Sequence, residues 1–429
     1  MKDLEKRFAA LGVAIPEILL PKEGTDMAKW AVIACDQFSS DKSYWEDVNK
    51  LAGSSPSALN LILPECYLGE RELPEQVAGI NSVMKEYIDQ GVFQALRPGF
   101  ILVERKVENL PVRQGIVLSV DLEQYDFREG TKSLIRPTEG TILDRLPPRI
   151  QIREGAALDL PHILFLIDDP EMTVIEKAAE QKEKMDLLYD IELMKGGGRV
   201  TGRKIDDPVM LGDIASALEK LGENKDLLFA VGDGNHSLAA AKSIWERIKS
   251  RGGDNVMNHP ARWALVEVEN IYNPGLVFEP IHRVLFDARP EVFLEQIGKL
   301  PSCRVEDEQD RLNTAEDDGE YRIRFITENR TGKVIIEKGS TTLAAEGLQS
   351  VLDDYIEKNT GIEIDYIHGD EAVEELARKP GNIGFYLPPL DKGEFFAIIM
   401  EKGPMPRKTF SLGEAEGKRY YLEARKLIP

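Results

Sequence analysis

A loop that holds an aspartate, an asparagine and a histidine between glycines interrupts the segment LLFAVGDGNHSLAAAK at 227–242. The apolar run before the loop predicts a buried strand, and the apolar spacing after it predicts an amphipathic helix. Gly232 and Gly234 permit a tight turn between the two. Such a turn aims the N–H groups of the first helical turn outward, which favours an anion such as phosphate.

The side chains of this loop could serve a phosphate site. Asp233 could hold Mg²⁺ or accept a proton from a hydroxyl group. His236 could donate a hydrogen bond to phosphate or relay a proton, and Asn235 or Ser237 could cap the helix. The alternative interpretation is structural, with capping polar residues and a packed histidine. The spacing matches neither a Walker A loop nor a dinucleotide fingerprint.

A second polar segment, RPTEGTILDR at 136–145, lies in a stretch broken by proline and glycine. It contains Arg136, Glu139, Thr141, Asp144 and Arg145. Arginine is the usual partner of phosphate and carboxylate groups, and a glutamate among arginines could be an ionised catalytic carboxylate. The alternative is a solvated loop whose surface ion pairs contribute little.

Basic residues also stand in two later segments. In EPIHRVLF at 279–286, His282 and Arg283 interrupt an apolar run, so they are either anion ligands or buried structural residues. In MPRKTF at 405–410, Lys408 follows a predicted helix and could close over an anion or lie on the surface.

The remaining patterns predict an α/β (α+β) fold with mixed sheets. Runs rich in β-branched residues at 100–107 and 115–122 predict strands, and so does the apolar run at 276–286. Helices are predicted at about 171–184 and near 208–222, and helices alternate with strands after 342. We place a boundary between an N-terminal α/β region at 1–287, which carries GDGNHS, and a C-terminal α/β region at 288–429. The second region ends in the MPRKTF segment, and we expect both regions to pack as one unit.

Composition limits the function classes. The chain has 54 basic and 75 acidic residues, a net charge of −21, which argues against non-specific binding to nucleic acid or anionic membranes. Its three cysteines are widely spaced, which predicts neither a disulfide framework nor a zinc site. The start lacks a signal-peptide pattern and no apolar run is long enough to cross a bilayer, so we expect a cytoplasmic protein.

Five motifs in this order resemble the domain-of-unknown-function family DUF1015 over nearly the whole chain. They are RPTEGTILDR (136–145), GDGNHS (232–237), EPIHRVL (279–285), DYIHGDEAV (365–373) and MPRKTF (405–410). The family is similar, more distantly, to the ParB-like superfamily, which includes free-serine kinases and CTP-binding ParB proteins. The resemblance therefore implies a ParB-like nucleotide- or phosphate-binding core.

Members of the family typically carry Asp-Gly-His-His-Arg at the position of 233–237, so here Asn235 replaces a histidine and Ser237 an arginine. The resemblance implies catalytic roles for Glu139, Asp233 and His236, and Mg²⁺ ligands in Asp233 and Asp144. The residues expected to bind phosphate or nucleotide are Gly232, Gly234, Asn235, Ser237, Arg136, Thr141, Arg145, His282, Arg283 and Lys408.

The leading hypothesis is a kinase or phosphotransferase that uses ATP or ADP with Mg²⁺ and acts on a small hydroxylated metabolite such as serine. Two alternatives stay open: a nucleotide- or metabolite-binding regulator without turnover, and a metal-dependent phosphate-ester hydrolase. The expected partners are a small-molecule substrate and a nucleotide, without nucleic acid or membrane, and a homo-oligomer is left open.

Overall fold

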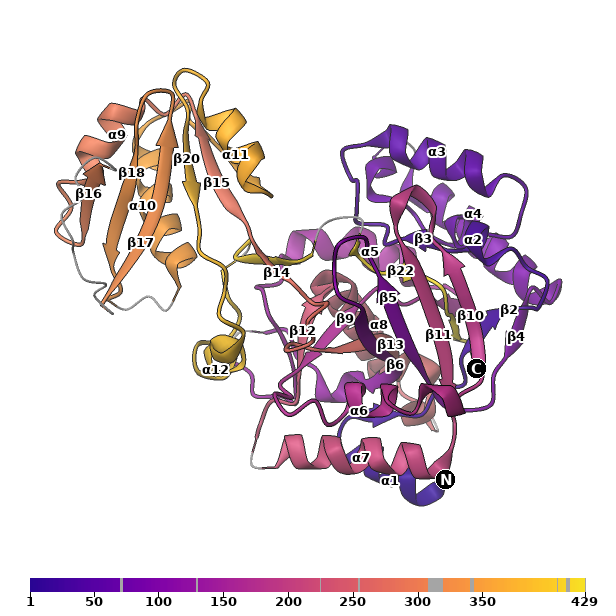
Figure 1. The fold of residues 1–429 in the computed structure, drawn as a ribbon. Coiled ribbons are helices and arrows are strands. Elements are labelled where there is room, and N and C mark those ends of the chain that lie inside the picture. Colours follow the sequence, from indigo (N-terminus) through magenta and orange to yellow (C-terminus); the bar gives the residue numbers. More distant parts are fainter. Residues whose placement is uncertain are drawn as a thin grey trace. The chain divides into compact units, whose positions relative to one another are not determined.

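The computed structural model describes residues 1–69, 72–128, 130–223, 225–253, 255–307, 319–339, 343–406, 408–413 and 417–428. The chain divides into two compact units. The first unit contains Met1–Val277, Ile399–Pro404 and the described part of Ala415–Pro429. The second contains Phe278–Ile398 and the described part of Met405–Glu414. Figure 1 shows the strands and helices of each unit.

The division differs from the boundary that we placed after residue 287. The strand β15 (His282–Phe286) pairs with β19 (Glu363–Ile367) and β20 (Ile383–Tyr386), so its backbone hydrogen bonds already belong to the second unit. The C-terminal segment returns to the first unit, where β22 (Tyr420–Tyr421) pairs with β3 (Val32–Ile33). Strand pairing over long sequence distances therefore sets the division.

A mixed sheet of nine strands forms the frame of the first unit, within the described residues. The strand order is β10-β11-β5-β6-β13-β9-β12-β7, and β1 pairs with β6. The strands are β1 (Val13–Ala14), β5 (Phe100–Lys106), β6 (Arg113–Asp121), β7 (Ile135–Pro137), β9 (Leu164–Ile167), β10 (Leu187–Glu192), β11 (Arg199–Ile205), β12 (Phe229–Asp233) and β13 (Trp263–Asn270). Shorter pairs are β2 (Leu19–Pro21) with β4 (Phe93–Ala95) and β8 (Leu158–Asp159) with β23 (Arg425–Lys426).

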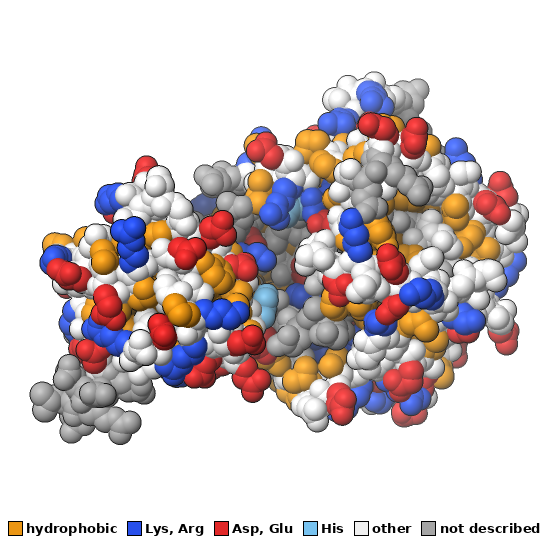
Figure 2. Space-filling model, turned by 90° about the horizontal axis from the view of Figure 1, so that it is seen from above, with side chains coloured by type: hydrophobic (Ala, Val, Ile, Leu, Met, Phe, Trp, Pro, Cys, Tyr) orange, Lys and Arg blue, Asp and Glu red, His pale blue; other side chains and the backbone are white. Residues whose placement is uncertain are grey.

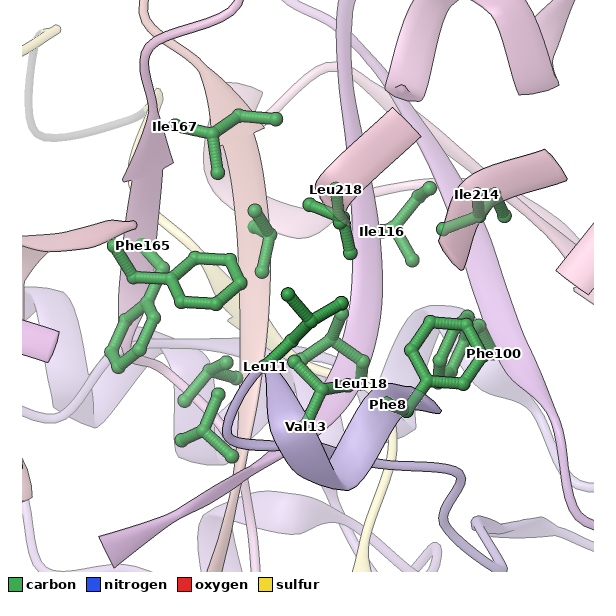
Figure 3. Packing of buried hydrophobic residues seen from close by; sticks show 14 of the residues in the cluster. Phe8, Leu11, Val13, Phe100, Ile116, Leu118, Phe165, Ile167, Ile214 and Leu218 are labelled. Carbon is green, nitrogen blue, oxygen red and sulfur yellow. The ribbon is translucent and has the colours of Figure 1, made fainter. Parts of the chain in front are cut away.

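Both faces of this sheet are covered, because alternate residues of its central strands enter two different cores. Phe100 and Leu102 face the core under α1 (Lys2–Ala10), α6 (Ile175–Ala179), α7 (Pro208–Gly222) and α8 (Asn235–Arg251). Ile101 and Val103 face the other core, under α2 (Met27–Trp30), α3 (Lys42–Ala52) and α4 (Leu73–Asp89). Figure 3 shows Phe8 and Leu11, at the end of α1, against sheet residues of the first core.

The end of β12 is the point where the sheet positions the GDGNHS loop. β7 runs parallel to β12, with Ala230 opposite Arg136, so the carboxyl ends of both strands lie at the same end of the sheet. β9 runs antiparallel to β12 on its other side, so the residues just before β9 also lie at that end of the sheet. The helix α5 (Leu146–Arg153) packs its Leu146 and Ile150 against α8.

The second unit is an antiparallel sheet of six strands, within the described residues, in the order β16-β18-β17-β20-β15-β19. Its remaining strands are β16 (Cys303–Asp307), β17 (Glu320–Thr327) and β18 (Thr331–Glu337). α9 (Pro290–Ile297) and α10 (Ala344–Lys358) pack on one face, and α11 (Asp370–Ala377) packs on the other. A separate pair joins β14 (Phe278–Pro280) to β21 (Phe410–Leu412), and α12 (Lys392–Lys402) follows β20.

The mixed α/β class predicted from the sequence is confirmed. Two predicted elements differ in extent. The predicted strand across 276–286 is divided into β14 and β15, each with its own partner strands. The segment expected to be helical across 171–184 keeps an α-helix only at Ile175–Ala179, because Asp169 caps an earlier turn through Thr173 N and Val174 N.

Figure 2 shows acidic and basic side chains interspersed over the visible surface of each unit. No helix among the described residues is long and apolar enough to cross a membrane.

We expect Phe165→Ala to lower the free energy of unfolding of the first unit by about 3–5 kcal/mol, because it leaves a cavity in a packed core. Phe165 is fully buried and its ring centroid lies 5.9 Å from that of Phe229. Val209→Ala, at a side chain that is 71% exposed, is the control. It should change the free energy of unfolding by less than about 0.5 kcal/mol. Urea unfolding followed by tryptophan fluorescence measures both, and equal midpoints for the two variants would contradict the packing described.

Candidate functional site

The GDGNHS loop forms a strand–turn–helix whose helix starts without a capping side chain. Gly234 takes a φ of 81°, and a Cβ there would meet Ile163 Cγ1 at 3.0 Å, so the turn needs glycine. The first intrahelical bond runs from Leu238 N to Gly234 O, and no acidic residue stands in the first turn. The positive end of the α8 dipole is therefore neither capped by a side chain nor neutralised within its own turn.

Asp233 does not cap this helix through its first turn but pairs with a lysine from the C-terminal segment. Its Oδ2 lies 3.2 Å from Lys418 Nζ, and its Oδ1 accepts a hydrogen bond from Gly234 N at 2.8 Å. Burial raises the pKa of Asp233, but the Lys418 ammonium and the hydrogen bonds outweigh burial and hold the pKa below its ordinary value. Asp233 is therefore ionised at neutral pH and a weak base.

The residues that follow β7 contact the GDGNHS loop, so two of the polar segments noted in the sequence are brought together. Ile142 N donates to His236 Nε2 at 3.2 Å, and Thr138 Oγ1 donates to Val231 O at 2.6 Å. Asn235 Nδ2 lies 3.4 Å from Thr138 Oγ1. These bonds dock the 138–142 loop, which follows β7, onto the end of β12 and the start of α8.

His236 contacts the 138–142 loop. Because its Nε2 accepts a hydrogen bond from Ile142 N, that nitrogen carries no proton in this arrangement. The ring therefore helps to hold the loop that contains Glu139, and the catalytic role expected for His236 stays a prediction.

Two buried polar atoms at this junction have no hydrogen-bond partner among the residues that the structure describes. They are Asn235 Oδ1 and Thr141 Oγ1. Asn235 is only 8% exposed, and buried polar groups are normally paired. A bound molecule with polar atoms would satisfy them, which fits a polar ligand such as a nucleotide at this place.

A hydrogen-bonded chain runs from Ser237 into the core beside the same turn. Ser237 Oγ lies 2.8 Å from His162 Nε2, and His162 Nδ1 lies 3.2 Å from the Tyr421 hydroxyl. Cys35 N donates to that hydroxyl at 3.2 Å. Burial lowers the pKa of His162, although Asp36 and Asp233 act against burial, so the imidazole is neutral at pH 7.

A buried ionic cluster fixes the segment that supplies Lys418 and Tyr421. Arg419 forms ion pairs with Glu267 of β13 and with Glu423, whose Oε2 lies 2.6 Å from Arg419 Nη2. Arg419 Nε also donates to Pro161 O at 3.2 Å, next to His162. Tyr189 of β10 donates to Glu423. The cluster ties the C-terminal segment to β13, β10 and the start of β9.

Three other residues of the RPTEGTILDR segment were also expected at the site. Arg136 is buried and contacts the residues before β7 and β12, since its Nε donates to Ser133 O at 3.1 Å and its Nη2 lies 3.0 Å from Asp226 Oδ2. Asp144 and Arg145 are exposed. The roles of these three residues in binding phosphate or Mg²⁺ stay predictions.

The other expected anion ligands belong to the second unit. His282 is buried, its Nδ1 accepts from Leu387 N at 3.0 Å and its Nε2 lies 2.9 Å from Asp370 Oδ1. Arg283 is 1% exposed and bonds to Ile281 O, with Gln349 Oε1 3.2 Å from its Nε. These contacts support the structural interpretation of both residues. Lys408 is exposed, and its neighbour Arg407 lies outside the described residues.

The residues present do not form a Mg²⁺ cage. Within the part of the chain that the structure describes, no group of three or more His, Cys, Asp or Glu side chains could hold a metal ion. Asp233 is engaged by Lys418, and Asp144 is exposed. Proteins often bind Mg²⁺ through one or two carboxylates together with substrate phosphates, and the Mg²⁺ roles of Asp233 and Asp144 stay predictions.

The sequence interpretation did not select His162, Lys418, Arg419 and Tyr421. The available signals were a histidine directly before the apolar run 163–167 and the two basic residues that precede a tyrosine pair at 418–421. Neither signal identifies its partner, because those partners lie 75 and 259 residues away from His162 in sequence.

We expect Asp233→Asn to destabilise the first unit by about 1–3 kcal/mol at pH 7, because Lys418 loses its charged partner. The lowered pKa of Asp233 means that the pair stabilises fully above the ordinary carboxylate pKa and less as pH falls through the folded-state pKa. The difference from wild type should therefore shrink below about pH 4. Urea unfolding at pH 7 and in acid measures the difference in the free energy of unfolding between wild type and variant. Asp89→Asn, at an exposed aspartate, is the control. A difference that stays constant with pH would rule out the ion pair.

Comparisons with known proteins give one family and several solved structures. A free serine kinase variant in complex with AMP has 13% identity and a TM-score of 0.41, covering 75% of this chain and 95% of that chain. A conserved hypothetical protein from Pyrococcus furiosus has 13% identity and a TM-score of 0.36, covering 73% and 95%. SbnI from Staphylococcus aureus, truncated at its C-terminus, has 11% identity and a TM-score of 0.36, covering 71% and 85%.

At these TM-scores the similarities carry no inference about activity, and a ParB-like core stays a prediction. No curated protein matches the chain. The family described as "Protein of unknown function (DUF1015)" matches residues 19–424. The chain therefore belongs to this family.

Proposed function

We propose that the chain binds ATP or ADP through its phosphates at the start of α8 and transfers a phosphoryl group to a hydroxyl of a small metabolite. The observation that carries the proposal is the uncapped start of α8 at the edge where the parallel strands β7 and β12 end. Ligands of α/β sheets bind at the carboxyl ends of strands, and helix starts favour phosphate.

The residues of the loop take distinct parts in this proposal. Gly232 and Gly234 let the backbone approach the phosphates closely, and Asn235, Ser237 and Thr141 offer polar groups to the nucleotide. Lys418, held 3.2 Å from Asp233, keeps the acidic residue before the helix from repelling the phosphates.

The acceptor hydroxyl needs a group that takes its proton. Asp233 is a weak base because of its lowered pKa and is paired with Lys418, so it does not take this proton. Glu139 receives the proton while the acceptor oxygen bonds to phosphorus and the bond to the leaving phosphate breaks. Positioning and electrostatics supply most of the catalysis in such transfers.

We expect Glu139→Gln to lower kcat by roughly 10²–10⁴-fold while the Kd for nucleotide stays within about twofold, because only proton transfer is removed. The assay incubates the full chain with ATP or ADP, MgCl₂ and a panel of hydroxylated compounds that includes serine, and detects phosphorylated product by mass spectrometry. Glu108→Gln, at an exposed glutamate, is the matched control.

The same assay separates the alternatives. Nucleotide binding without product for any acceptor would replace the transferase by a binding regulator. Absence of nucleotide binding would refute both.

His236→Ala should lower kcat at least tenfold with the unfolding midpoint little changed, because the 138–142 loop loses the acceptor of Ile142 N. His236→Gln, whose side-chain oxygen can accept the same bond, should restore part of the activity. If the glutamine variant is as impaired as the alanine variant, the imidazole has a chemical task and is more than a positioning residue.

A further inference from the structure

A cavity of about 120 Å³ lies in the first unit beside the start of α8. Its lining is mainly aliphatic and includes Leu61, Ile62, Leu63, Ile152, Leu160 and Ala240. An apolar protein cavity of about 150 Å³ can stay dry and bind benzene. The cavity therefore suits an apolar group of about six carbon atoms.

The hydrogen-bonded chain of Ser237 gives this cavity one polar wall. Ser237, His162 and Tyr421 all line it. The Tyr421 oxygen accepts from Cys35 N, and its O–H can donate to His162 Nδ1. His162 Nε2–H then donates to Ser237 Oγ, and the serine O–H is left to donate to a ligand oxygen.

The charges around the cavity are already neutralised in pairs. Arg149 forms an ion pair with Glu65, and Arg153 Nη1 lies 2.5 Å from Asp159 Oδ1. A free amino acid would bring an ammonium and a carboxylate into this space. Burying charges without new partners is costly, so the cavity disfavours a zwitterion such as serine.

We infer that this cavity holds the body of the phosphoryl acceptor, an uncharged alcohol with an apolar group of about six carbon atoms. Its hydroxyl oxygen accepts a hydrogen bond from Ser237. The hydroxyl proton passes to Glu139 as the oxygen bonds to phosphorus, and the nucleotide leaves with one phosphate fewer. The acceptor role rests on the proposed function, whereas the ligand class rests on the cavity alone.

The binding experiment uses the full chain with benzyl alcohol, 1-hexanol, toluene and L-serine, measured by isothermal titration calorimetry. The two alcohols should bind more tightly than toluene and at least tenfold more tightly than serine. Ala240→Leu places extra carbon atoms in the cavity and should weaken benzyl alcohol at least tenfold. Ser250→Leu, which adds the same side chain at an exposed position of α8, should leave its Kd unchanged. An unchanged urea unfolding midpoint, followed by tryptophan fluorescence, serves as the check that both variants are folded.

Ser237→Ala tests the polar wall separately. It should reduce the preference for benzyl alcohol over toluene about threefold or more, without weakening toluene. Serine binding as tightly as the alcohols, or alcohols unaffected by Ala240→Leu, would overturn the inference.

A failure of the proposed function gives a different result. Alcohols that bind and respond to Ala240→Leu, with no nucleotide bound by the wild type, would support the ligand class and overturn the acceptor role. Alcohols that bind and become phosphorylated would support both.

Discussion

The buried guanidinium of Arg419 is the interaction on which the candidate site depends. It joins Glu267 on a central strand to Glu423 in the C-terminal segment and also binds the carbonyl of Pro161. A buried charge is tolerated only when it is paired and hydrogen-bonded, so these four groups fix one another. The adjoining residues then place Lys418 at Asp233 and Tyr421 at His162. A segment near the end of the chain thereby completes a turn that forms some 190 residues earlier.

The site separates its charges by location. At the helix start, the carboxylate of Asp233 is offset by Lys418, and the α8 dipole favours a further anion. In the cavity behind Ser237, paired charges and aliphatic side chains leave a space suited to an uncharged group. Ser237 belongs both to the start of α8 and to the cavity wall, because its backbone is in the first turn of α8 and its hydroxyl bonds to His162. Two chemically different ligands could therefore meet at one residue.

Local sequence patterns predicted the frame well. The strands predicted from β-branched residues at 100–107 and 115–122, the helix predicted near 208–222 and the α/β alternation after 342 all correspond to elements of the structure. The GDGNHS turn was also predicted, because glycine spacing between an apolar run and a helical period has few other solutions. Pattern alone did not decide where a strand ends when its partners change, as in the division of 276–286 into β14 and β15.

The sequence by itself determined the fold class and the strand–turn–helix, and only its resemblance to a family indicated Glu139 as a site residue. Only the tertiary structure decided which side chains complete the site. Arg136 and His282 have the right residue types for an anion site, but their hydrogen bonds are used within the frame. His162 and Lys418 carried no such signal, yet the pairing of β9 beside β12 and the Arg419 cluster bring them to the turn. The physical reason is that side-chain chemistry is local, whereas its partners are set by strand order and buried charge pairing across the whole chain.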